Sequence, residues 1–510
     1  MGRTPRRRAR EERLGVPMSA PENGAVRDAG SPLRICIYAF SSTALFFRAL
    51  IDECARAGDS IDWSVIQPQG HFRYVLDGVV PDDRRCYLYD RFGERYAANS
   101  SADLERALAS GDGIVSGLFK DKDGYRWLDK DEQMRRAAAM DAVYRAFLRR
   151  MNPDFVLFPD LETVDGFILM NVCRDLGIGV LYYTGLRFLG RAYFAPDAVE
   201  TLPAYFGDYT DGDRIAARKV IDHYLAGIGN EPGHRYPRTI PPKPSWFRRI
   251  IVSSWLRHTR ERLHASEETF AMRITRHILG VMTRVRRRRF DLVAARYFDA
   301  RDAAAPLPPK FVLYALQYTP ESSINGLEPY YVDQTRVIDA LLLSLPPGYR
   351  LLVKEHPAMM GMRPIAFYRE LRRKPGLVLA HPRIDTRKLM MSASIVATVT
   401  GTIGLEAWLL GKPAVLFGRS FFSHLCYRAP APGELRPFLE RVIADHVAPT
   451  EADKERELAR LLAVGDDFVI SDPWFVPTVM APDNVRATRA YLWRHLARLG
   501  VAAATASRGA

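Results

Sequence analysis

Short apolar segments alternate with helical patterns along most of this chain of 510 residues. Near the start, an apolar run at 34–40 precedes a helical pattern at 44–57, and a second apolar run follows at 63–67. Apolar strands joined by helices are typical of parallel sheets, whose strands are buried on both faces. The alternation therefore predicts an α/β fold built on parallel strands with helical crossovers.

The alternation occurs in two successive blocks. The first continues with a helix predicted at 134–151 and strands at 153–158 and 180–183. In the second block we predict strands at 311–316, 349–353, 377–379, 395–398 and 414–417, and helices at 332–343, 367–373, 387–392 and 405–410. A last helix is predicted at 484–498. Two such blocks indicate two Rossmann-like domains.

Composition shifts set the domain limits. We predict a disordered basic tail at 1–33, a Rossmann-like domain at 34–235, a basic linker at 236–305, a second Rossmann-like domain at 306–480, and a C-terminal helix and tail at 481–510. The linker opens with four prolines between 237 and 244 and continues with an arginine-rich helical pattern. Two interpretations of it stay open, a solvated helix between domains and a helix lying on a membrane surface.

The distribution of charge indicates which classes of partner the protein could bind. The net charge of +14 is concentrated in the tail and the linker, and no nucleic-acid-binding motif accompanies it, so we expect no nucleic-acid partner. Such basic surfaces suit anionic lipids or acidic sugars.

The five cysteines are scattered without metal-ligand spacing, which predicts buried core residues in a reducing compartment. With no signal-peptide pattern or membrane-spanning run, we expect a cytoplasmic protein, with peripheral contact to the inner face of the plasma membrane as an open alternative.

A turn rich in glycine and threonine, residues 400–404, follows the predicted strand at 395–398 and leads into a helix. Backbone N–H groups and the positive end of a helix dipole would favour an anion such as phosphate there. Gly401 and Gly404 leave room for close approach of a ligand, and the hydroxyls of Thr400 and Thr402 add hydrogen-bonding groups. Glu406 would repel phosphate, so we expect it to accept a hydrogen bond from a ribose hydroxyl.

Polar residues also follow two other strands of the second block. Lys354 and His356 end the strand at 349–353, while Gln317 and Glu321 follow the strand at 311–316. Ligands of open parallel sheets bind beyond the carboxyl ends of the strands. We therefore predict that His356 assists a departing phosphate, that Lys354 and Gln317 bind the ligand, and that Glu321 is a catalytic candidate.

The first block offers a carboxylate for proton transfer. Asp160 follows the strand at 153–158 and is our first candidate to take or orient a hydroxyl proton, ahead of Glu162 and Asp165. His71, Arg187 and His381 are weaker candidates. No metal site is predicted, because no cluster has ligand spacing.

Several motifs of the second block together resemble the bacterial capsule polysaccharide biosynthesis family, which includes capsular Kdo transferases and capsule export proteins. The resemblance covers about Phe311 to Gly418. Its elements are Leu316-Gln-Tyr-Thr-Pro-Glu321, Asp333-Gln334, Leu345-Pro-Pro-Gly-Tyr-Arg350, Val353-Lys-Glu-His-Pro357, Thr400-Gly-Thr-Ile-Gly-Leu-Glu-Ala407 and Gly411-Lys-Pro413. Residues 34–235 match only in pattern, through Pro153-Asp154 and Tyr183-Thr-Gly-Leu-Arg187.

The resemblance implies a GT-B-like fold, with two Rossmann-like domains facing a cleft, a nucleotide-sugar donor on the second domain and the acceptor on the first. It implies a metal-independent glycosyltransferase that needs no cofactor. Its donor is a nucleotide-activated sugar, for which CMP-Kdo is one candidate, and its acceptor is a surface polysaccharide or a lipid-linked precursor. The capsule assembly machinery is a further candidate partner. Two alternatives remain, a non-catalytic polysaccharide-binding or export-assembly protein and a GT-B-like nucleotide-sugar epimerase.

Overall fold

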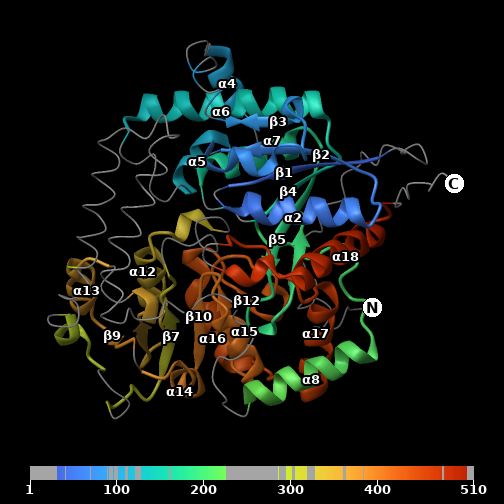
Figure 1. Cartoon of the computed structure of the whole chain (residues 1–510). Helices are drawn as coiled ribbons and strands as arrows, with labels where there is room; N and C mark the ends of the chain where they lie inside the picture. Colours follow the sequence, from blue (N-terminus) through green and yellow to red (C-terminus); the bar gives the residue numbers. More distant parts are fainter. Residues whose placement is uncertain are drawn as a thin grey trace, which may run out of the picture. The chain divides into compact units, whose positions relative to one another are not determined.

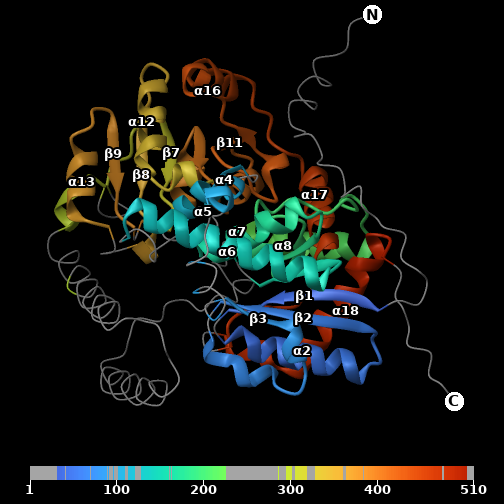
Figure 2. The same cartoon turned by 90° about the horizontal axis from the view of Figure 1, so that it is seen from above.

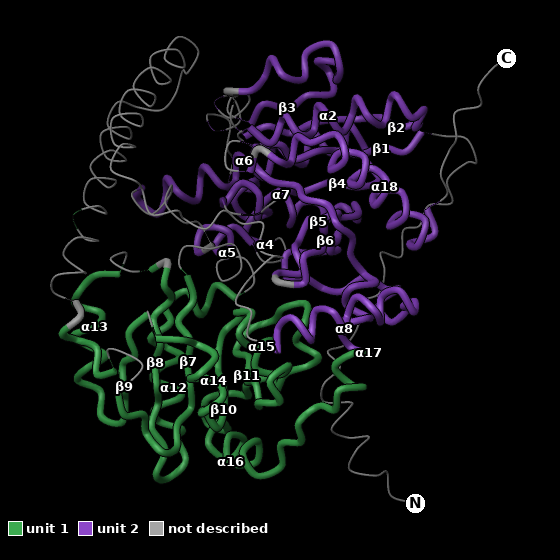
Figure 3. Tube along the Cα trace, turned by 60° about the horizontal axis from the view of Figure 1, so that its bottom comes forward, with its two compact units in different colours: residues 1–18, 267–455 green, residues 19–266, 456–510 purple. Residues whose placement is uncertain are grey.

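The computed structural model describes residues 32–225 and 294–501 apart from short gaps. The gaps are at 41, 69, parts of 89–100, 110–112, 121–127, 160, 162, 301–304, 319–327, 360–362, 383 and 474–475. Most of the predicted tail and of the predicted basic linker therefore lies outside the described residues. The chain divides into two compact units, coloured separately in Figure 3: unit 1 comprises 1–18 and 267–455, and unit 2 comprises 19–266 and 456–510.

Unit 2 contains a sheet of six strands in the order β3-β2-β1-β4-β5-β6. The strands are β1 (Leu33–Tyr38), β2 (Ile61–Gln67), β3 (Arg85–Tyr87), β4 (Phe155–Phe158), β5 (Gly179–Gly185) and β6 (Ala192–Ala195). Neighbouring strands are parallel except β6, which pairs antiparallel with β5. Between β1 and β2 the register pairs Leu33 with Ile61 and Tyr38 with Ile66.

The helices described in unit 2 are α2 (Thr43–Arg56), α4 (Ser101–Ala109), α5 (Gly113–Lys120), α6 (Lys130–Met151), α7 (Val164–Asp175), α8 (Asp211–Leu225) and α18 (Pro482–Arg498). In Figure 2, α2 lies on one side of β1 and β2, while α6 and α7 lie on the other. The Asp129 carboxylate caps the first turn of α6 by accepting the N–H groups of Asp131 and Glu132.

Unit 1 contains a second sheet of six strands, in the order β12-β11-β10-β7-β8-β9. The strands are β7 (Phe311–Ala315), β8 (Arg350–Lys354), β9 (Leu377–Ala380), β10 (Ile395–Thr398), β11 (Ala414–Leu416) and β12 (Tyr427–Arg428). The helices are α12 (Thr335–Ser344), α13 (Ile365–Arg372), α14 (Thr386–Ser392), α15 (Ile403–Leu409) and α16 (Leu435–Asp445), and α17 (Glu451–Val464) crosses from unit 1 into unit 2. All five strand pairs are parallel.

Counted within its own unit, each sheet has the strand order 3-2-1-4-5-6, which is the order of Rossmann folds. The predicted α/β class with two Rossmann-like domains is therefore confirmed. The core of unit 1 explains the apolar runs: Val312, Tyr314, Leu351 and Val353 are fully buried and pack with residues of α12, α13 and α16. Phe311 and Leu313 are buried as well, so β7 is covered on both faces.

The prediction that the cysteines are buried core residues is confirmed. All five are buried, and none forms a disulfide. Burial raises the pKa of the Cys36 thiol to about 12. The cysteines therefore act as small apolar core residues.

The predicted domain limit at 480 is wrong, because the chain enters unit 2 at residue 456. The ring of Tyr491 on α18 lies 5.4 Å from Phe194 of β6 and 4.6 Å from Phe468. Arg489 on the same helix donates two hydrogen bonds of 2.5 Å to Asp59, which follows α2. The last helix therefore completes the first Rossmann unit, and α2 and α18 lie side by side in Figures 1 and 2.

His495 on α18 makes the stability of unit 2 depend on pH. It is 3% exposed, and its Nδ1 lies 2.6 Å from the Tyr205 hydroxyl. Burial, and then the charge of Arg498, lower the pKa of His495 to about 3. An unfolded histidine has a pKa of about 6.5. Between pH 6.5 and pH 3 the unfolded chain therefore binds more protons than the folded chain, and the free energy of unfolding decreases as the pH falls.

We expect this histidine to cost unit 2 about 2 kcal/mol of stability between pH 7 and pH 5. Hydrogen exchange of β1 peptides at the two pH values measures the loss, and a His495→Gln variant should lose less. An equal loss in both proteins would show that other groups control the acid sensitivity.

Among the described residues, no helix is both long and apolar enough to cross a bilayer. The predicted location of the protein and its contact with a membrane stay predictions.

Candidate functional site

The carboxyl ends of β7 and β10 meet where the strand order of unit 1 reverses. From these two adjacent parallel strands the sheet continues in opposite directions, to β8 on one side and to β11 on the other. Ligands of open α/β sheets bind at this kind of switch point. Gln317 follows β7 and Thr400 follows β10, so two of the predicted site residues lie here.

Gln317 and Thr400 are in direct contact. The Gln317 side-chain amide lies 2.9 Å from Thr400 Oγ1, and both residues are buried. In the amide orientation that satisfies the surrounding donors, Gln317 Oε1 also accepts from the N–H groups of Gly401 at 2.6 Å and Thr400 at 3.1 Å. Gln317 thus occupies two of the N–H groups that we predicted for an anion. The anion-binding N–H groups are therefore expected further along the turn.

The turn continues into α15, a helix of seven residues. Thr402 precedes it and makes no side-chain cap, while its hydroxyl donates to Glu406 Oε1 at 3.4 Å. Gly404 lies within the first turn, where a Cβ atom would approach Leu416 Cδ2 to 2.9 Å. Glycine is therefore needed at 404 for packing against β11, in addition to any role in binding.

His356 follows β8, the neighbour of β7. Its side chain is exposed, and its ring centroid lies 6.2 Å from that of Tyr318. Partial burial, and then the charges of Lys354 and Arg363, lower the pKa of His356 to about 4. The imidazole is therefore neutral at pH 7 and offers an N–H donor.

Glu355 lies beneath this edge and is fully buried. Its Oε1 accepts from the His356 backbone N–H at 2.7 Å, and its Oε2 accepts from Arg363 Nε at 2.8 Å and the Tyr368 hydroxyl at 2.9 Å. Burial raises the pKa of the Glu355 carboxyl, and Arg363 opposes this shift. Arg363 was not predicted from the sequence, because nothing in its spacing separates it from the other lysines and arginines of the chain.

Lys354 points towards the neighbouring strand end. It is 3% exposed, and its Nζ donates to the Pro382 carbonyl at 3.1 Å. Burial lowers the pKa of Lys354 to about 8, against the opposing effect of Glu355 and Asp385. In this structure the ammonium group holds the loop after β9, so its predicted ligand contact stays a prediction.

Three of the predicted acids lie outside the described residues: Asp160, Glu162 and Glu321. Asp165 is described, is buried, and accepts from the Tyr38 hydroxyl at 2.7 Å. At the carboxyl end of β5, Arg187 forms an ion pair with the buried Glu200, and both residues have a positive φ. The first sheet thus has a polar carboxyl edge, on which the catalytic acid stays a prediction.

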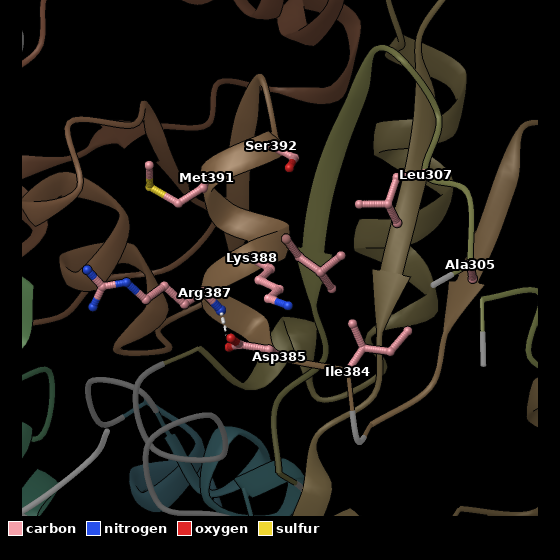
Figure 4. Close-up of a pocket in the computed structure, with 9 residues that line it drawn as sticks. Ala305, Leu307, Ile384, Asp385, Arg387, Lys388, Met391 and Ser392 are labelled. Carbon is pink, nitrogen blue, oxygen red and sulfur yellow. Dashed lines mark hydrogen bonds between the residues drawn. The ribbon is translucent and has the colours of Figure 1, made fainter. Parts of the chain in front are cut away.

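A surface pocket of about 420 Å³ lies elsewhere in unit 1, along α14 (Figure 4). Its lining includes Leu307, Ile384, Lys388 and Met391. The Asp385 side chain beside it accepts the Arg387 backbone N–H at 2.9 Å and caps α14. None of the residues predicted for the site lines this pocket.

Among the described residues, no group of three or more histidine, cysteine, aspartate or glutamate side chains could hold a metal ion. Independence from metal stays a prediction.

Comparisons with known proteins identify relatives of part of the chain. Protein FixF of Sinorhizobium fredii is 26% identical over 129 residues, which cover 23% of this chain and 28% of FixF. The chain thus spans little more than a quarter of the length of this curated relative.

Solved structures align over more of the chain, at low similarity. A UDP-GlcNAc 2-epimerase from Neisseria meningitidis is 11% identical, with a TM-score of 0.21, and covers 91% of this chain and 100% of its own. KpsC of Thermosulfurimonas dismutans, a β-Kdo 2,7 transferase, is 12% identical, with a TM-score of 0.29, and covers 70% and 89%. The assignment of the fold therefore depends on the strand order of the two sheets and not on these alignments.

The match that does bear on the site is to a family model described as capsule polysaccharide biosynthesis protein, over residues 269–426. This range contains β7 to β11 together with Gln317, His356 and the 400–404 turn. Residues 269–426 are therefore similar to the capsule polysaccharide biosynthesis family.

Proposed function

We propose that this protein is a glycosyltransferase that moves a sugar from a nucleotide-activated donor to a capsular or other surface polysaccharide, or to its lipid-linked precursor. One observation carries the proposal. The segment that matches the capsule family places His356, Gln317 and Thr400 on neighbouring strand ends at the switch point of unit 1. This is where Rossmann-type sheets bind nucleotides.

In the proposed reaction, the bond between the sugar and the donor phosphate breaks, and the acceptor hydroxyl forms the new bond to the sugar. Charge develops on the leaving phosphate, and the His356 N–H together with the first turn of α15 would stabilise it. Glu406, half-buried in that turn, would accept a hydrogen bond from a ribose hydroxyl. With these donors in place, the reaction would need neither a divalent metal nor a cofactor.

The acceptor hydroxyl must lose a proton, and a carboxylate of unit 2 is the proposed base. Asp160 remains the first candidate from its position after β4. The acceptor itself, a glycan or a glycolipid, would bind at the polar carboxyl edge of the unit 2 sheet. Contact with the inner membrane surface or the capsule assembly machinery through the basic segment at 236–305 belongs to the same proposal.

The proposal is tested by thermal-shift measurements against CMP, UDP, GDP and their sugar conjugates. A ligand that binds only the folded protein raises its stability by mass action. CMP-Kdo and UDP-GlcNAc belong in the panel, because the first is the donor candidate named above and the second tests the alternative of a nucleotide-sugar epimerase. A shift with one nucleotide supports a donor site, and no shift with any of them favours a glycan-binding or export-assembly role.

A second measurement distinguishes a glycosyltransferase from a nucleotide-sugar epimerase. A transferase needs an acceptor glycan before the donor sugar is consumed beyond slow hydrolysis, whereas an epimerase converts the nucleotide-sugar alone. We expect consumption to require the acceptor and to continue in EDTA. Rapid conversion of the donor without an acceptor would favour the epimerase.

Gly401 gives a sharper test of the donor site. A Cβ atom there would lie 2.7 Å from Thr398 Oγ1 and 3.2 Å from the end of the Gln317 side-chain amide. Thr398 is fully buried and has little room to move. We expect Gly401→Ala to weaken nucleotide binding at least about tenfold, because close packing makes such an overlap costly.

The matched control is Gly433→Ala, where a Cβ atom would meet nothing within 4 Å. Isothermal titration with the nucleotide found by the thermal-shift panel measures both variants. Equal affinities in folded Gly401→Ala and wild type would place the nucleotide away from this turn.

A further inference from the structure

One guanidinium group connects the two strand ends that carry the candidate site. Arg363 precedes α13, and its side chain is 10% exposed. Its Nε donates to Glu355 Oε2 at 2.8 Å, and its Nη2 donates to the Gln317 backbone carbonyl at 2.6 Å. The planar fork lies with its central carbon 5.2 Å from the centroid of the Phe367 ring. Packing and two charge-assisted hydrogen bonds therefore fix its orientation.

The first contact leads to His356. Glu355 is fully buried, and while Oε2 accepts from Arg363 and Tyr368, its Oε1 accepts the backbone N–H of His356 at 2.7 Å. A carboxylate with both oxygens engaged has one orientation. Arg363 thus fixes, through Glu355, the point where the backbone leaves β8 and presents the imidazole.

The second contact leads to the turn at 400–404. The Gln317 carbonyl accepts from Arg363 and from Gln334 Nε2 at 3.1 Å, while Gln334 Oε1 accepts the Gln317 backbone N–H at 2.8 Å. With its backbone held on both sides, Gln317 places its side-chain amide on Thr400. Arg363 therefore also fixes, through Gln317, the start of the turn.

We propose that Arg363 is a positioning residue that holds the His356 end of β8 and the Gln317–Thr400 turn in register, so that both meet the donor phosphate together. This role rests on the proposed function. Lysine could not replace Arg363, because a single ammonium group cannot reproduce a rigid fork that reaches two separate acceptors. Arg363 is not assigned contact with the substrate.

The test compares Arg363→Lys with a matched control, Arg369→Lys, on the exposed surface of α13. The Arg363→Lys variant keeps a positive charge beside Glu355, which limits the loss of folding that removing the charge would cause. Hydrogen exchange followed by mass spectrometry reports on the apo protein and needs no activity. We expect Arg363→Lys to speed exchange at least about tenfold in peptides at both strand ends, 354–359 and 315–318, and the control to change neither.

The second measurement is a double-mutant cycle that combines Arg363→Lys with His356→Ala and follows the rate of sugar transfer. Arg363→Lys should lower kcat at least about tenfold while the nucleotide Kd stays within about threefold. In the His356→Ala background the same change should lower kcat less than it does in wild type, because the part of its effect that acts through His356 is lost with that residue and only the part that acts through the Gln317–Thr400 turn stays. A merely structural Arg363 would lower the melting temperature without this non-additivity.

The two measurements separate failure of this inference from failure of the proposed function. The positioning role is overturned if exchange becomes faster at only one strand end or at neither. It is also overturned if the effects of Arg363→Lys and His356→Ala on kcat are fully additive. A wild-type protein that binds no nucleotide and transfers no sugar overturns the proposed function, and the exchange measurement then still decides whether Arg363 couples the two strand ends.

Discussion

Replacing His356 by alanine is expected to lower the rate of sugar transfer roughly 100-fold or more. The imidazole follows β8 beside the switch point and lies next to Tyr318. Since the pKa of His356 is lowered to about 4, the free protein carries a neutral N–H donor at pH 7. A donor aimed at charge that develops only in the transition state contributes chiefly to kcat, and removing one such donor costs about 10²–10³-fold.

Single-turnover rates at saturating donor measure this effect apart from product release. The control is His446→Ala, in the same unit, where Nε2 lies 3.1 Å from the Gly411 carbonyl and Nδ1 lies 3.3 Å from the Tyr427 hydroxyl. That histidine is hydrogen-bonded away from the site, so its loss should leave the rate per folded molecule within about twofold. A folded His356→Ala protein that turns over within threefold of wild type would remove His356 from the chemistry.

Strands β7 to β11 of unit 1 could be predicted closely, because each contains a buried apolar run. The run at 395–398 coincides with β10, and the predicted strand at 349–353 differs from β8 by one residue at each end. Parallel strands covered on both faces leave this signal whatever their neighbours are. The strands that we did not predict each lie at an edge of a sheet: β3 and β6 end the first sheet, and β12 ends the second. Of these, β6 also pairs antiparallel with its neighbour.

The site was predictable to the extent that it depends on strand ends. Gln317, His356 and Thr400 each follow a strand, and parallel strands bring their carboxyl ends to one edge. The side-chain directions were not predictable. Lys354 and His356 are two residues apart in sequence, yet Lys354 is buried against the loop after β9 while His356 is exposed. Arg363 joins the site across a gap in sequence that only the folded sheet closes.

The return of residues 456–510 to unit 2 was not predictable either. The sequence of α18 shows an amphipathic helix, but it does not say which sheet the apolar face covers. Val485, Tyr491, Leu492 and Leu496 are buried, and the aromatic contacts of Tyr491 are to β6 and to Phe468 in unit 2. A helix that follows the whole second block in sequence thus belongs to the core of the first Rossmann unit, which could not be inferred from its position.

Tyr491→Ala is therefore expected to destabilise unit 2 by about 3–5 kcal/mol and to leave unit 1 unchanged. The side chain is 2% exposed, its ring packs between Phe194 and Phe468, and its hydroxyl donates to the Val464 carbonyl at 2.7 Å. Removing it leaves a cavity and an acceptor without its donor, and both effects lower the free energy of unfolding.

Because a chain with two units need not unfold in one step, the measurement must report on each unit separately. Hydrogen exchange of β1 peptides reports on unit 2, and that of β8 peptides reports on unit 1. The expected loss corresponds to exchange at least about 100-fold faster in β1, with β8 unchanged. The control, Tyr74→Ala, removes a tyrosine of unit 2 that is 66% exposed and should cost less than about 0.5 kcal/mol. Faster exchange in β8 instead of β1 would show that α18 stabilises unit 1 and not unit 2.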